Sequence, residues 1–158
     1  MKKPIFKPKP GQVDYTKAHW APVINCVLKY QSKILLVKRS ANLKYSPGYW
    51  SGISGFLDDY RSLLEKVTLE IKEELGLSRK QIKRIRLGGI FDQEDKQYKK
   101  IWIVHFLLVE VKTDKVKIDW EAQEYKWLTL SEAKKLRLLP GFRQILDKLS
   151  PWIEQKNN

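Results

Sequence analysis

Apolar residues gather in short runs along the first third of the chain, and turn-forming residues separate the runs. Residues 21–29 and 33–39 are two such runs on either side of the polar residues 30–32. This spacing predicts two antiparallel strands joined in a tight hairpin. A loop ends at 46–48, and residues 49–57 follow with two glycines in a strand-like stretch. Glycine at such positions indicates that a ligand or another backbone segment comes close.

The pattern changes to a helical period after Ser62. Ser62 and Glu65 form a capping box, in which a hydroxyl and a carboxylate satisfy free amides at a helix start. Apolar residues three and four positions apart are predicted to form the buried face: Leu64, Val67, Ile71 and Leu75. Gly76 is the stop expected just past a C-terminus, so the helix is predicted to end at Leu75.

Further strands are predicted in the second half of the chain. Residues 85–91 and 101–111 are apolar runs, and the second is almost unbroken, which is typical of a central strand. The polar residues 92–100 are the expected turn between them. After a charged loop at 113–119, a short strand is predicted at 125–128.

Two more helices are predicted near the C-terminus. Thr129 and Glu132 form a second capping box, which predicts a helix through Leu136. A last helix from Phe142 carries an apolar face made of Ile145, Leu146 and Leu149. Pro151 is expected to kink or end this last helix, because proline lacks the amide hydrogen that the helix needs.

The element order suggests one domain preceded by an arm. Residues 1–18 are rich in Lys and Pro without an apolar period, so we predict an extended arm followed by a single domain at 19–158. A chain of 158 residues with 42% hydrophobic residues can bury a core without disulfide or zinc staples. The starting expectation is therefore one α/β or α+β domain.

Composition limits the compartment and the class of partner. Cys26 is the only cysteine, which excludes an intramolecular disulfide and a cysteine-based zinc site. The chain shows neither a signal-peptide pattern nor an apolar run of membrane-spanning length, so we expect a soluble cytoplasmic protein without membrane contact. The net charge of +13 favours anionic partners such as phosphates, nucleotides or RNA. The alternative is that scattered lysines only keep the protein soluble.

Three glutamates on the helix that follows Ser62 carry the candidate chemistry. Glu70, Glu73 and Glu74 stand at i, i+3 and i+4, so their carboxylates lie on one side of the helix. Like charges at this spacing destabilise a helix unless water, lysines or a divalent cation compensate them. The sequence alone leaves open a solvated acidic face and a metal site.

Gly55, fourteen intervening residues and the stretch from Glu70 to Leu77 resemble the Nudix box, whose pattern is Gx5Ex7REUxEExGU with U aliphatic. The resemblance implies an α+β fold, an αβα sandwich with a mixed sheet flanked by helices. It also implies that Glu70, Glu73 and Glu74 bind Mg²⁺ or Mn²⁺, with the backbone carbonyl of Gly55 as a further ligand.

Two box positions depart from the pattern, because Arg61 stands in place of the first glutamate and Leu69 in place of the arginine. In the family these two residues form a structural ion pair, so losing both together does not leave an orphaned charge. Asp58 and Asp59 in the adjacent loop are candidate compensating carboxylates, or plain turn residues.

Residues outside the box complete the candidate site. One of Glu73, Glu74 or the loop residue Glu121 is expected to accept a proton from water, and Glu121 is preferred over its neighbour Glu124. Arg39 is a candidate phosphate ligand because a guanidinium can grip two oxygens. Three aromatic residues could stack on a base, with a core position as the alternative: Tyr49, Trp50 and Phe91.

The resemblance implies a metal-dependent hydrolase of a diphosphate linkage, with water attacking phosphorus in a nucleoside diphosphate-X or nucleoside triphosphate type substrate. Two alternatives stay open. One is a Nudix-fold module that binds nucleotide or RNA without catalysis. The other is a pyrophosphohydrolase of RNA 5′ ends, which the basic charge favours.

Overall fold

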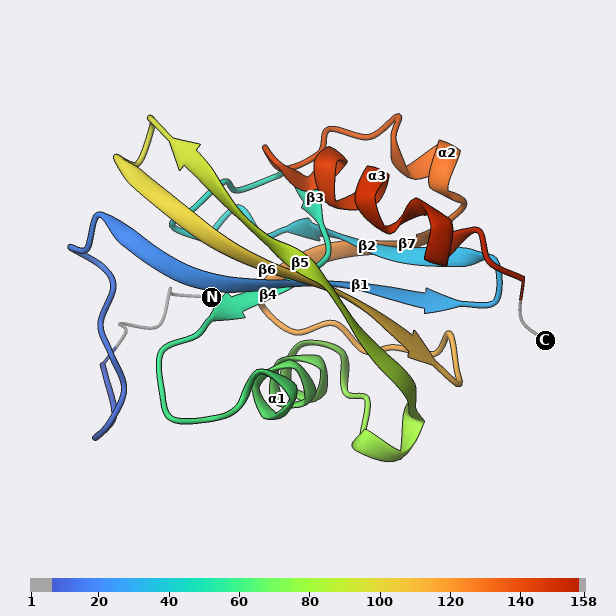
Figure 1. Cartoon of the computed structure of the whole chain (residues 1–158), viewed down its shortest axis with the longest axis horizontal. Helices are drawn as coiled ribbons and strands as arrows, with labels where there is room; N and C mark the ends of the chain where they lie inside the picture. The colour runs from blue at the N-terminus through green and yellow to red at the C-terminus, as the bar shows by residue number, and fades with distance from the viewer. Residues whose placement is uncertain (1–6, 157–158) are drawn as a thin grey trace.

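A seven-stranded mixed sheet forms the middle layer of the protein, and helices cover both of its faces (Figure 1). The computed structural model describes residues 7–156, so residues 1–6 of the predicted arm lie outside the described part. The strands are β1 (Trp20–Tyr30), β2 (Lys33–Arg39), β3 (Trp50–Ser51), β4 (Ile53–Phe56), β5 (Ile82–Asp95), β6 (Lys100–Val111) and β7 (Ala122–Leu128). The helices are α1 (Leu63–Leu75), the 3₁₀ turn η1 (Arg79–Gln81), α2 (Leu130–Ala133) and α3 (Phe142–Ile153). The predicted α+β sandwich is confirmed.

Strand β1 is the axis of the sheet. It pairs in parallel with β6 and antiparallel with β2 and β4, and the order along the sheet is β3-β2-β1-β6-β5. Strand β7 pairs with the other edge of β2. The predicted hairpin and the inner position of β6 are confirmed, and Gln31 makes the tight turn with a φ of 54°.

The predicted turn at 92–100 is wrong in length. Strand β5 continues to Asp95, which pairs with Lys100, so only residues 96–99 turn. Polar residues are not tolerated in a fully buried strand. In this part of β5 alternate side chains are exposed to solvent, so polar residues fit and the backbone pairing with β6 continues.

Helix α1 has the predicted ends but a different buried face. The Ser62 hydroxyl accepts a hydrogen bond from the amide of Glu65, and Gly76 closes the helix with a φ of 70°. Leu64, predicted to be buried, is 56% exposed, because the stripe follows steps of four from Leu63 through Val67. A charged residue, Lys66, is buried instead.

This buried face predicts that shortening the side chains of Ile71 and Leu64 will lower the free energy of unfolding by different amounts. Ile71→Val removes one methylene from a fully buried side chain and should lower the free energy of unfolding by about 1 kcal/mol. Leu64→Ala removes more atoms from an exposed side chain and should change it by less than about 0.5 kcal/mol. Urea unfolding of the two variants measures both values, and a larger loss for Leu64→Ala would contradict the assignment.

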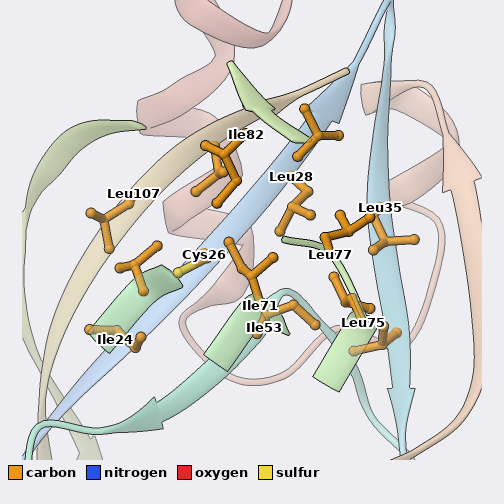
Figure 2. Close-up of a cluster of buried hydrophobic side chains, with 14 residues drawn as sticks. Ile24, Cys26, Leu28, Leu35, Ile53, Ile71, Leu75, Leu77, Ile82 and Leu107 are labelled. Carbon is orange, nitrogen blue, oxygen red and sulfur yellow. The ribbon is translucent and has the colours of Figure 1, made fainter. Parts of the chain in front are cut away.

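Two hydrophobic clusters hold the layers together. The first lies between α1 and the sheet and contains side chains of β1, β2, β6 and α1, Cys26 among them (Figure 2). The second lies under α3 and includes Phe106, Phe142 and Leu146. Because successive residues of a strand face opposite sides, each long strand contributes to both clusters.

The C-terminal helices differ in length from the prediction. Helix α2 starts at the confirmed capping box of Thr129 but ends at Ala133, short of Leu136. Helix α3 continues through Pro151 to Ile153. The carbonyl of Asp147, which proline cannot bond, accepts a hydrogen bond of 2.7 Å from the Ser150 hydroxyl, so the last turn survives. No helix in residues 7–156 has the length and apolar character needed to cross a membrane.

Candidate functional site

Glu70 of α1 lies directly against the backbone of β4. A Cβ atom on Gly55 would lie 2.7 Å from the carboxyl carbon of Glu70, so any larger residue at position 55 would displace this carboxylate. Gly52 is tighter still, since its Cβ would lie 2.3 Å from the backbone carbonyl oxygen of Cys26. Both glycines of the 49–57 segment therefore allow the close approach that the sequence indicated, and one of them admits a carboxylate.

Glu74, one turn further along α1, meets Glu121 from the loop before β7. The Asp119 amide donates a hydrogen bond of 3.2 Å to the Glu74 carbonyl, which brings this loop against the end of α1. Among residues 7–156, Glu74 Oε2 is buried without a hydrogen-bond partner. The loop is fixed by two bonds: the Ser40 amide donates to the Glu121 carbonyl at 2.8 Å, and the Glu121 amide donates to the Asp119 carboxylate at 3.0 Å. The fold thus brings Glu121 to the helix, whereas Glu124 pairs with Lys126 on β7.

Burial and mutual repulsion raise the pKa values of these carboxyl groups. Burial raises the pKa of Glu70 to about 7, with Lys66 opposing the rise and Glu121 and Glu73 adding to it. The pKa of Glu74 is raised well above its usual value by burial and then by Glu121. Burial, followed by the charge of Glu121, also raises the pKa of Asp119. We call Glu70, Glu73, Glu74, Asp119 and Glu121 the acidic centre.

The acidic centre fits a divalent cation by the chemistry of its donors. Carboxylate oxygens are the ligands that Mg²⁺ prefers, and the buried Glu74 Oε2 needs a partner that the described part of the chain does not provide. Within residues 7–156, no group of three His, Cys, Asp or Glu side chains is already gathered around one point. Glu73 is exposed at the rim, so its side chain would have to turn inward to join a shared ion.

Gly55→Ala tests the contact between β4 and Glu70. The added methyl group would push the Glu70 carboxylate, the flexible end of a side chain, away from the strand. We expect Mn²⁺ affinity to fall by about tenfold, as for other changes that misplace a metal ligand, with a small change in thermal midpoint. Calorimetric titration with Mn²⁺ measures the first and thermal unfolding the second; unchanged affinity would contradict the placement of Glu70.

Sequence reasoning missed two members of this region. The sequence places Asp119 in a charged loop with no site role, although it lies two residues before Glu121. Lys66 lies one helical turn before Glu70, and its Nζ is 3.7 Å from Glu70 Oε1. The i, i+4 spacing of opposite charges was a readable signal for that pair.

Arg39 at the end of β2 is hydrogen-bonded to the neighbouring loop. Its Nη2 donates to the carbonyl of Tyr45 at 2.9 Å, its Nε donates to the carbonyls of Tyr45 and Ser46 at 3.2 Å, and its Nη1 donates to the Ser54 hydroxyl. Burial lowers the pKa of Arg39, and the nearby Glu74 and Glu121 oppose this change. Contact between Arg39 and phosphate stays a prediction, and it requires some of these donors to be released.

Two of the predicted stacking residues, Trp50 and Phe91, lie on the face of the sheet opposite α1. Trp50 is 7% exposed and, with Phe91, belongs to the cluster under α3, on the opposite face of the sheet from α1. Tyr49 lies 4.1 Å from the guanidinium of Arg137. Strand alternation explains the placement, because Trp50 faces the same side as Lys38 and not the side of Val37. Base stacking on these residues stays a prediction.

Comparison with known proteins agrees with this geometry. The MutT protein of Methanosarcina mazei Go1 has a TM-score of 0.71 at 23% identity, with 86% of this chain and 96% of that chain covered. A MutT Nudix hydrolase from Burkholderia pseudomallei gives 0.71 at 20% identity, with 82% and 98% covered. The Nudix domain of Shewanella oneidensis NrtR, solved with ADP ribose, gives 0.70 at 18% identity, with 85% and 88% covered.

These structural similarities establish the fold. Family membership is established by the match of the sequence to a domain model. No curated protein matches this chain. The Nudix domain model matches residues 19–153, which include every strand from Trp20 and all three helices. The chain belongs to the Nudix hydrolase superfamily.

Proposed function

We propose that this protein is a Mg²⁺-dependent hydrolase of the diphosphate linkage in a nucleoside diphosphate-X or nucleoside triphosphate type substrate. Mn²⁺ is the alternative cation. One observation supports the proposal above all: the acidic centre buries an unpartnered Glu74 oxygen beside carboxyl groups whose pKa values are raised. Such a group favours a divalent cation, and a diphosphate supplies the remaining oxygen ligands that Mg²⁺ takes.

The residues of the chain divide the work. Glu70 and Glu74 would hold the cation, with Glu73 and the Gly55 carbonyl as further ligands. When bound, Mg²⁺ would neutralise charge on the phosphate oxygens and lower the pKa of the attacking water. One of Glu73, Glu74 or Glu121 would accept a proton from the attacking water. The water oxygen would bond to phosphorus, and the bond to the bridging oxygen would break, so that the second phosphate leaves with this oxygen.

A second candidate is a module that binds a nucleotide without cleaving it. Arg61 and Leu69 depart from the Nudix box. The Nudix domain of NrtR was solved with ADP ribose, which is a nucleoside diphosphate linked to a further group. The same acidic centre would then serve affinity alone.

A substrate panel separates the two candidates. The protein is incubated with nucleoside triphosphates, ADP ribose and a dinucleoside tetraphosphate, in Mg²⁺ and in Mn²⁺, and phosphate and pyrophosphate release are measured. Turnover of one compound that stops on addition of EDTA supports the hydrolase. Tight binding of a compound that stays intact supports the binding module and overturns the proposal.

An RNA 5′ end is a further substrate of the same chemical class. The net charge of +13 favours a polyanion over a small nucleotide. If several RNA phosphates are contacted, the affinity for a 5′-triphosphorylated oligonucleotide should fall by orders of magnitude between about 50 and 200 mM salt. A flat salt response would exclude RNA.

A further inference from the structure

The two residues at which this chain departs from the Nudix box place no positively charged side chain beside Glu70. Leu69 is uncharged, and Arg61 pairs at the surface with Asp59. Lys66 provides the positive charge instead. Its Nζ lies 2.9 Å from Asp58 Oδ1, 3.6 Å from Asp59 Oδ2 and 3.7 Å from Glu70 Oε1.

The Lys66–Asp58 pair is shielded from water. The two side chains are 7% and 8% exposed, so each charge depends on the other. Lys66 and Glu70 stand at i and i+4 on α1, which puts the ammonium group beside the carboxylate that faces Gly55. The ion pair therefore joins three features: the loop after β4, the first half of α1 and the acidic centre.

The arm before β1 holds the other side of Asp58. Gln12 Nε2 donates to Asp58 Oδ2 at 2.8 Å, and the Val13 amide donates to the Asp58 carbonyl at 2.6 Å. Tyr15 donates its hydroxyl to the Leu57 carbonyl at 3.3 Å, and its ring stacks on Phe56 at 5.9 Å. The arm thus fixes the three residues that directly follow Gly55.

The side chain of Gln12 is itself oriented by a local turn. Its Oε1 accepts a hydrogen bond of 3.0 Å from the backbone amide of Lys9, while the backbone amide of Gln12 donates to the Lys9 carbonyl at 2.9 Å. With Oε1 occupied in this way, Nε2 is directed at Asp58. Lys9 and Gln12 precede the matched Nudix region, which begins at residue 19.

We propose that residues 12–15, Asp58 and Lys66 form one positioning unit, the arm clasp, which holds Glu70 against Gly55 for cation binding. Lys66 is a positioning residue that acts through Glu70, and Gln12 acts through Asp58. The arm clasp replaces the ion pair that Arg61 and Leu69 cannot make. This inference rests on the proposed function, because it assigns the clasp to the same acidic centre.

Cation affinity distinguishes positioning from simple charge. Removing a positive charge beside a cation site should by Coulomb's law strengthen cation binding. If Lys66 positions Glu70, Lys66→Met should weaken it instead, by about tenfold or more, as loss of a residue that orients a metal ligand does. Lys66→Arg keeps the charge and should recover most of the affinity.

The experiment measures Mn²⁺ affinity of the full chain by calorimetric titration and by electron paramagnetic resonance, together with the thermal midpoint of each variant. Lys72→Met is the matched control, because it removes the same charge from an exposed position on the same helix. Gln12→Ala leaves every charge in place and should weaken Mn²⁺ binding roughly threefold. Its control is Gln123→Ala, an exposed glutamine on β7.

Each outcome decides the inference. Weaker binding in Lys66→Met and Gln12→Ala, with unchanged binding in both controls, supports the arm clasp. Equal or tighter binding in Lys66→Met overturns it while leaving the proposed function intact. If Lys66→Met does not fold, the Mn²⁺ affinities of Gln12→Ala and Lys66→Arg still test the inference. Unchanged Mn²⁺ affinity in Gln12→Ala would show that the arm does not position Glu70. A wild-type protein that binds no Mn²⁺ overturns both the inference and the proposed function.

Discussion

Glu74→Gln should lower kcat by about 10²–10⁴-fold on any nucleotide that the wild-type protein cleaves. Glutamine keeps the shape of the side chain but removes a negative charge and a proton acceptor. The loss should be large because Glu74 lies near Glu121 at the end of α1, and its buried Oε2 has no hydrogen-bond partner among the residues that the structure describes. Phosphate and pyrophosphate release with Mg²⁺ measures the rate.

The control for this change is Glu65→Gln, which removes the same charge from an exposed position in the first turn of α1. It should leave kcat within about twofold of the wild type, since surface charge changes far from the acidic centre have small effects. Equal background rates in the wild type and Glu74→Gln would end the hydrolase proposal and leave the binding module.

The second large effect is a loss of stability as the pH rises in the absence of metal. The pKa of Glu70 is raised from 4.5 to about 7 in the folded protein, so between these values the folded state keeps a proton that the unfolded chain has released. This stabilisation is complete below the unfolded pKa and is lost as the pH rises through about 7. Glu74 adds to the change in the same direction.

The expected loss from Glu70 is on the order of 3 kcal/mol between about pH 4.5 and 7.5. Urea unfolding with EDTA at a series of pH values measures it, and Glu70→Gln should flatten the profile because glutamine mimics the protonated carboxyl group. Mg²⁺ should restore stability above pH 7, since a ligand that binds only the folded state stabilises it. A free energy of unfolding that rises between pH 5 and 7 would contradict the prediction.

Local signals in the sequence predicted the frame of the site well. Ser62 and Gly76 fixed the ends of α1, because a cap and a left-handed glycine act within one helical turn. Gly55 was also informative, because a glycine in a strand indicates that another group comes close. In the structure this group is the Glu70 carboxylate. The spacing of the glutamates then determined which side chains share a helix face.

Long-range pairing was what the sequence did not predict. Lys66 is a charged residue at a buried helix position, and it becomes acceptable only because Asp58 lies 2.9 Å away. The Gln12–Asp58 bond joins residues 46 positions apart, and no periodicity reports such a contact. The same limit applies to Trp50, which faces α3 because of its register with Lys38, although it lies near Gly55 in the sequence.

The buried cysteine of β1 has a practical use. Cys26 lies in the layer beneath α1, and its thiol pKa is raised by burial and then by Glu74 and Glu70. A buried, protonated thiol does not react with an alkylating reagent until local opening exposes it. The alkylation rate of Cys26 therefore reports how often α1 separates from the sheet. Because this chain has one cysteine, a single mass shift per molecule would time that motion without any engineered label.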